Sequence, residues 1–125
     1  MKLADILAKH DRVIIAGVPG AGKTYATKGI TDRPVIHTDD HKDKAWADAP
    51  KAIAESVPSG PVVIEGVRAL AATKHLDEPV TCVVWLDRPR KPLNAKQKAM
   101  AKGRRTNFAR WRAENPDVDV ESLED

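Results

Sequence analysis

The stretch that decides the fold is GVPGAGKT, residues 17–24, which follows the apolar run VIIA at residues 13–16. Gly17, Gly20 and Gly22 leave the backbone almost bare where that run ends. A short, β-branched apolar run is typical of a strand buried on both faces of a sheet, and the residues after Gly22 have a helical composition. The sequence therefore predicts a strand, a glycine-rich loop and a helix in succession.

The loop satisfies the full pattern GxxxxGK[ST] through Gly17, Gly22, Lys23 and Thr24. Backbone N–H groups of such a turn, at the positive end of a helix, form a cradle for phosphate oxygens. In this pattern Lys23 reaches the β- and γ-phosphates, and the Thr24 hydroxyl binds Mg²⁺. The alternative is a chance glycine turn between a strand and a helix. We expect a nucleotide, contacted also by the remaining loop residues Pro19, Gly20, Ala21 and Tyr25.

The composition favours a single domain over residues 1–125, with 42% hydrophobic and 31% charged residues. Cys82 is the only cysteine, so an internal disulfide and a cysteine-based metal cluster are excluded. The N-terminal residues lack the apolar stretch of a secretory signal, and no run approaches the ~20 apolar residues of a membrane span. We therefore expect a cytoplasmic protein with no membrane partner.

Charge is distributed very unevenly along the chain. Residues 88–112 contain ten Lys and Arg residues and no acid, whereas residues 114–125 contain six acids and no base. The basic segment repels itself unless an anion neutralises it. The candidates are a polyphosphate, a nucleic acid and the chain's own acidic tail.

Strand-like and helical segments alternate along the chain, which predicts an α/β fold with a mostly parallel sheet of four to five strands. Pro50 is expected to kink or split its helix, and Gly103 marks an expected break in the last one. The acidic tail holds a turn and a short strand or helix. We expect strands at 12–17, 33–40, 61–66 and 80–87, and helices at 2–10, 23–29, 42–57, 67–76 and 92–114.

Acidic residues follow three of the predicted strands, and ligands of open α/β sheets collect at these carboxyl ends. Asp39 and Asp40 follow the second strand, Glu65 ends the third and Asp87 ends the fourth. Such carboxylates suit an acceptor site or Mg²⁺. His37 and His41 flank the paired acids, where they contact an acceptor or hold a metal.

With these motifs the sequence resembles the small P-loop kinases, the group that includes adenylate, shikimate and polynucleotide kinases. The similar segments are GVPGAGKT, TDD at 38–40, VVIEG at 62–66 and VWLDRP at 84–89, over roughly residues 11–113. The resemblance implies a three-layer α/β/α P-loop NTPase fold with a helical, Arg-rich lid at about 88–113. It also implies that ATP or another nucleoside triphosphate is bound with Mg²⁺.

The resemblance implies roles for individual residues, each with an alternative. Lys23 and the lid residues Arg88, Arg104 and Arg105 would stabilise the charge of the transferred phosphoryl group, although the lid arginines could instead lie on a solvated helix face. Asp39, or else Asp40, would orient or deprotonate the acceptor hydroxyl; Asp40 could instead cap a helix. Glu65 or Asp87 would hold Mg²⁺, and Glu65 could instead pair with Arg68.

Three functions fit these features. The first is transfer of the γ-phosphate of ATP to a hydroxyl, or a phosphate, of a small molecule such as a nucleoside or nucleotide. The second is a kinase for the 5′-hydroxyl of a polynucleotide, favoured by the basic segment 88–112. The third is a non-catalytic or slow NTPase module that engages nucleic acid or a protein, favoured by the short chain that follows the lid.

Overall fold

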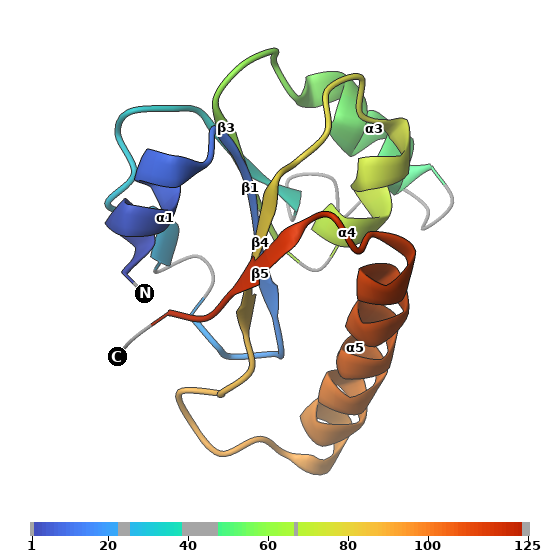
Figure 1. The fold of residues 1–125 in the computed structure, drawn as a ribbon. Helices are drawn as coiled ribbons and strands as arrows, with labels where there is room; N and C mark the ends of the chain where they lie inside the picture. Colours follow the sequence, from blue (N-terminus) through green and yellow to red (C-terminus); the bar gives the residue numbers. More distant parts are fainter. Residues whose placement is uncertain (1, 23–25, 39–47, 67, 124–125) are drawn as a thin grey trace.

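A five-stranded sheet, all of its strand pairs parallel, runs through the centre of the computed structural model, which describes residues 2–22, 26–38, 48–66 and 68–123 (Figure 1). The strand order is β2-β3-β1-β4-β5, so β1 is central. The predicted α/β class and parallel sheet are therefore confirmed. The strands are β1 Arg12–Gly17, β2 Val35–His37, β3 Val62–Glu65, β4 Cys82–Leu86 and β5 Asp119–Glu121.

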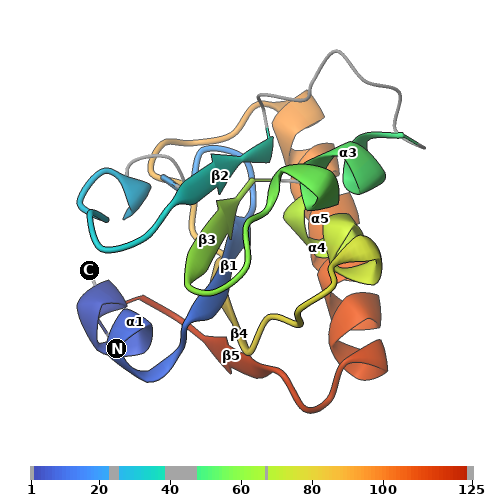
Figure 2. The same cartoon turned by 90° about the horizontal axis from the view of Figure 1, so that it is seen from above.

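Helices lie on both faces of the sheet (Figures 1 and 2). One face is covered by α1, and the opposite face by α3, α4 and α5. The helix α4 continues directly into a short 3-10 helix at Thr73–His75. The bounds of the four described α-helices are α1 Leu3–Lys9, α3 Ala49–Ser56, α4 Ala69–Ala72 and α5 Ala95–Glu114.

The central strand β1 joins two apolar cores because its side chains alternate between the faces. Ile14 and Ala16 pack with α3, α4 and α5, whereas Val13 and Ile15 pack with α1. All six residues of β1 are buried. This double burial is the reason that an uninterrupted apolar run, rather than an alternating one, marked the strand in the sequence.

The long helix α5 begins with a complete capping box between Asn94 and Gln97. It runs without interruption through Gly103 to Glu114, so the expected break at Gly103 is wrong. The helix packs on the sheet through Ala101, Phe108 and Trp111. The predicted lid corresponds to the loop after β4 together with α5; its movement over a nucleotide stays a prediction.

Pro50 lies at the start of the described helix α3, which agrees with a split of the helix expected at 42–57. The helix begins at Ala49 and Pro50 lies in its first turn, where the missing N–H of proline costs no hydrogen bond. The earlier part of the predicted helix, residues 42–47, lies outside the described residues. In the acidic tail, Asp119–Glu121 forms β5 and pairs in parallel with β4, so the tail supplies an edge strand.

The connections that follow the three middle strands, β3, β1 and β4, do not all lie on the same face of the sheet. After β1 it reaches the α1 face, where Ile30 packs. After β3 and β4 it enters α4 and α5 on the other face. The end of β1 is thus a topological switch point, the place where open α/β sheets bind ligands, and the glycine-rich loop begins there.

Among the described residues, no helix combines the length and the apolar character that a membrane span requires.

Candidate functional site

Gly17 ends β1 and lies directly against the end of β4. Its register partner is Leu86, and the N–H of Val18 donates a hydrogen bond of 3.0 Å to the Leu86 carbonyl oxygen. A Cβ atom built on Gly17 would overlap that oxygen. The first glycine of the motif is therefore needed so that two strands can approach each other.

The loop that follows turns through glycines with positive φ angles. Gly20 has φ of 71° and Gly22 has φ of 85°, a region that other residues rarely adopt. The carbonyl oxygen of Gly20 accepts a 2.8 Å hydrogen bond from the N–H of Arg90. The segment after β4 therefore folds back onto the glycine loop.

Arg90 is a site residue that the sequence pattern did not indicate. A Cβ built on Gly22 would lie 3.0 Å from Arg90 Cδ and 3.3 Å from its Nη1, so the guanidinium is held beside the last glycine of the motif. The signal that could have found it is RPR at 88–90, immediately after an expected strand end. The position of Arg90 beside Gly22, however, depends on how the loop after β4 folds, and the short sequence pattern carries no information about that fold.

The predicted lid arginines take separate positions. Arg104 donates a 3.4 Å hydrogen bond from Nη1 to the carbonyl oxygen of Gly17. Arg105 instead binds Asp87, with 2.8 Å between its Nε and Asp87 Oδ1. Arg88 is exposed. Arg104 therefore lies at the glycine loop, and Arg105 joins α5 to the end of β4.

Asp87, one of the two predicted magnesium carboxylates, already has two donors on one oxygen. Besides Arg105, the indole N–H of Trp85 donates to Asp87 Oδ1 at 3.1 Å. Partial burial raises the pKa of Asp87, but the hydrogen bonds from Arg105 and Trp85 outweigh it and leave the pKa below its usual value. The carboxylate is therefore held charged by the protein itself.

Glu65, the other predicted magnesium carboxylate, is 3% exposed at the end of β3. Its Oε2 lies 2.7 Å from His37 Nδ1 at the end of β2, and the two residues are register partners in the sheet. Thr38 packs against Gly66, and its Oγ1 is buried without a hydrogen-bond partner among the described residues. The ends of β2 and β3 thus bring an acid, a histidine and a hydroxyl together, and His37 contacts Glu65.

These oxygens fit a hard cation, because Mg²⁺ prefers carboxylate and other oxygen ligands. The described residues contain no group of three or more His, Cys, Asp or Glu side chains arranged to hold a metal. The expected set would be completed by Thr24. Cys82 is unsuited to chemistry here, since burial and the nearby Glu121 and Asp119 raise the pKa of its thiol to about 11.

Several predicted site residues lie outside the described part of the chain. They are Lys23, Thr24 and Tyr25 of the glycine loop and Asp39 and Asp40 after β2, together with the neighbouring His41. Of the other loop residues, Pro19 is buried and Ala21 is half-buried. Their expected contacts with a nucleotide stay predictions.

Comparison with known proteins finds no matching family model and no curated protein of significant similarity. The function of the protein is therefore inferred from the site.

Proposed function

We propose that this protein is an ATP-dependent phosphotransferase that moves the γ-phosphoryl group of ATP to a hydroxyl of a small molecule. One observation carries the proposal: the motif GVPGAGKT begins at the switch point of a parallel sheet, with Arg90 beside Gly22 and Arg104 on the carbonyl of Gly17. A glycine cradle, arginines and carboxylates at the strand ends are parts that phosphoryl transfer uses.

In the proposed reaction the acceptor oxygen forms a bond to the γ-phosphorus as the bond from that phosphorus to its bridging oxygen breaks. ADP leaves, and the hydroxyl proton passes to a base, for which the sequence offers Asp39 or Asp40. Bound Mg²⁺ would neutralise charge on the β- and γ-phosphates. The residues suited to hold it are Thr24 and Glu65; Asp87 is less suited because one of its oxygens already accepts two hydrogen bonds.

Positive charge at the transferred group is assigned to Lys23 and Arg90, with Arg104 nearby. Arg105 is the weaker candidate because its guanidinium binds both the carboxylate and the carbonyl oxygen of Asp87. This assignment gives the main role to Arg90 in place of the expected Arg88, Arg104 and Arg105.

The proposal is tested by following radiolabelled γ-phosphate from ATP into nucleosides, nucleotides, sugars and oligonucleotides with a 5′-hydroxyl. We expect transfer to a small molecule, and no ATP binding or transfer by Lys23→Ala. The control is Lys9→Ala, which removes the same charge from an exposed position at the end of α1. No transfer to any acceptor by the wild-type protein would contradict the proposal.

A polynucleotide acceptor is the second candidate, favoured by a row of basic residues on α5. Lys98, Lys102, Arg105 and Arg112 are all exposed, and spacings of four, three and seven residues place them along one side of a helix. Of these, Arg105 also binds Asp87. We name these four residues the outer stripe. If a nucleic acid binds, replacing Lys98 and Lys102 by Ala will weaken oligonucleotide binding. The slope of the logarithm of the binding constant against the logarithm of the salt concentration should fall by about one unit per replaced residue.

A further inference from the structure

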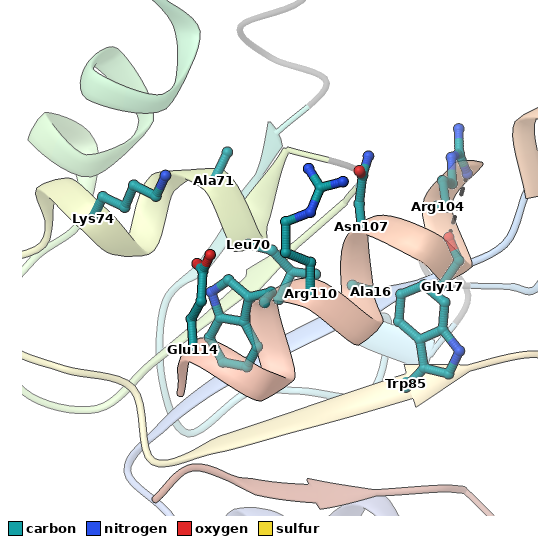
Figure 3. Close-up of a pocket in the computed structure, with 11 residues that line it drawn as sticks. Ala16, Gly17, Leu70, Ala71, Lys74, Trp85, Arg104, Asn107, Arg110 and Glu114 are labelled. Atoms are coloured by element: carbon teal, nitrogen blue, oxygen red, sulfur yellow. Dashed lines mark hydrogen bonds between the residues drawn. The ribbon is translucent and has the colours of Figure 1, made fainter. Parts of the chain in front are cut away.

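A cavity of about 300 Å³ lies between α4 and α5, next to the end of β1. Figure 3 shows Lys74 and Glu114 at one end, Gly17 and Arg104 at the other, and Arg110 between them. We call this cavity the α4–α5 groove. Its volume is at the lower limit of the ligand-site range, about 300 to 1,000 Å³, so it suits one small molecule.

Two tryptophans, whose indole N–H groups already donate hydrogen bonds, form the aromatic part of the groove wall, which also includes the amide side chain of Asn107. The Trp85 ring stacks on Phe108, with 4.2 Å between ring centroids and planes within 5°, which gives a fixed surface. The Trp111 indole N–H donates to Thr73 Oγ1 at 3.0 Å. Both tryptophans therefore present ring carbon to the groove, and a flat apolar ring is the ligand part that such walls accept.

The rim of the groove has an excess of positive charge. Lys74, Arg104 and Arg110 line it, against one carboxylate, Glu114. Lys74 and Arg110 are exposed, and within the described ranges neither one makes a hydrogen bond or an ion pair. Two cations without an ion pair among the described residues, beside an apolar wall, are complementary to an anionic group on an apolar body.

The groove also reaches the glycine loop. Gly17 lines it, and the hydrogen bond from Arg104 to the Gly17 carbonyl oxygen lies at that end. A molecule in the groove therefore has one end at the start of the motif and the other between Lys74 and Arg110. An acceptor placed in this way would present its near end to a nucleotide held by the loop.

From these observations we propose that the α4–α5 groove binds the phosphate acceptor, and that this acceptor is a small aromatic or heteroaromatic ring compound carrying a negatively charged group. The ring lies against Trp85 and Trp111, and the anionic group lies between Lys74 and Arg110. This inference rests on the proposed phosphotransferase function. It selects anionic ring compounds over neutral nucleosides, sugars and polynucleotides.

The groove is tested first by binding of the fluorescent aromatic sulfonate ANS, with the neutral N-phenylnaphthylamine as the uncharged counterpart. We expect Arg110→Ala and Lys74→Ala to weaken ANS binding about three- to tenfold each, since each removes one charge contact, and to leave the neutral probe almost unchanged. The matched control is Arg112→Ala. It removes an arginine two positions along the same helix, on its outer stripe, and should leave ANS binding unchanged. Equal effects of the Arg110 and Arg112 substitutions would overturn the proposal.

A second experiment separates this inference from the proposed function. With ATP saturating, Arg110→Ala should raise the KM of an anionic ring acceptor about three- to tenfold and leave the KM of ATP unchanged. If transfer occurs but acceptor KM does not change, the inference fails and the phosphotransferase stands. If ANS binding responds as expected but no acceptor is phosphorylated, the proposed function fails, and with it the acceptor role of the groove.

Discussion

Arg90 is the residue whose position most changes the interpretation of the site. Its N–H binds the Gly20 carbonyl at 2.8 Å and its side chain lies beside Gly22. If it stabilises the transferred phosphoryl group, Arg90→Ala will lower kcat about 100- to 1,000-fold, the typical loss for one charge-stabilising donor. ATP affinity, measured by equilibrium titration, should change much less, because the contact strengthens in the transition state.

The neighbouring Lys91 provides the control for this prediction. It is exposed and next in sequence, so Lys91→Ala removes a positive charge from the same loop without removing the side chain at Gly22. A loss of kcat as large in Lys91→Ala as in Arg90→Ala would mean that the net charge of the loop, rather than the Arg90 position, is responsible.

The lowered pKa of Asp87 predicts that the stability of the protein depends on pH. Because the folded protein lowers its pKa, the charged form contributes stability above the unfolded pKa of about 3.9, and the contribution is lost as pH falls through the lower folded value. The Asp87–Arg105 pair is 54% and 48% exposed, so Asp87→Asn should cost less than about 1 kcal/mol at pH 7. Urea unfolding between pH 3 and pH 7 should show the difference closing below about pH 4.

The matched control is Asp77→Asn, since Asp77 is exposed and makes no ion pair within the described part of the chain. Its effect on the free energy of unfolding should be near zero at both pH values. A constant difference for Asp87→Asn across the whole pH range would contradict the charge-based explanation.

At the scale of elements, α5 gives a direct test of the continuous helix. Gly103 lies within α5, and a Cβ added there would meet nothing within 4 Å. Gly103→Ala should therefore raise the free energy of unfolding by about 0.5–1 kcal/mol with no change in urea m-value, because alanine loses less backbone entropy in a helix. The reverse change at an exposed site of the same helix, Ala109→Gly, should destabilise by a similar amount. Destabilisation by Gly103→Ala would instead support the helix break that was expected at Gly103.

Elements with a strong local pattern were predictable, and those defined by distant contacts were not. The run at 12–17 forms β1 with the predicted bounds, because a continuous run of apolar residues is typical of a strand that is buried on both faces. For the tail the sequence left a short strand or a helix open, because β5 is stabilised by pairing with β4 rather than by its own composition. Pro50 was expected to kink or split its helix, and it lies in the first turn of α3, where proline begins a helix without the loss of a hydrogen bond.

The same distinction applies to the candidate site. The glycine motif and the acidic strand ends follow from short patterns. Neither the Arg90 position nor the α4–α5 groove could be predicted, because both depend on how segments far apart in sequence pack: the loop after β4 on the motif, and α4 beside α5. The pairing of Glu65 with His37 needed the register of β2 on β3. The residue types of the site could thus be predicted from short patterns, whereas their contacts depend on tertiary packing.

At the scale of the whole molecule, the two cores share one strand. Ile14 packs on the α3–α5 face and Ile15 on the α1 face, and both are fully buried. Because β1 also pairs with both β3 and β4, loss of either core removes support from the other. We therefore expect both faces to unfold in one cooperative transition, as is usual for single domains of this size.

Conservative truncations on opposite faces test this coupling. Ile14→Val and Ile15→Val should each lower the free energy of unfolding by about 0.5–1.5 kcal/mol. Trp85 and Trp111, two of the three tryptophans, belong to the core on the α3–α5 face. In a Trp46→Phe background their fluorescence therefore reports on that face, whereas far-ultraviolet circular dichroism reports on all helices and strands. Ile15→Val should shift the midpoints of both signals equally, although Ile15 lies on the opposite face. A shift confined to circular dichroism would show that the two cores unfold separately, and that the strand end carrying the glycine loop is held by each of them independently.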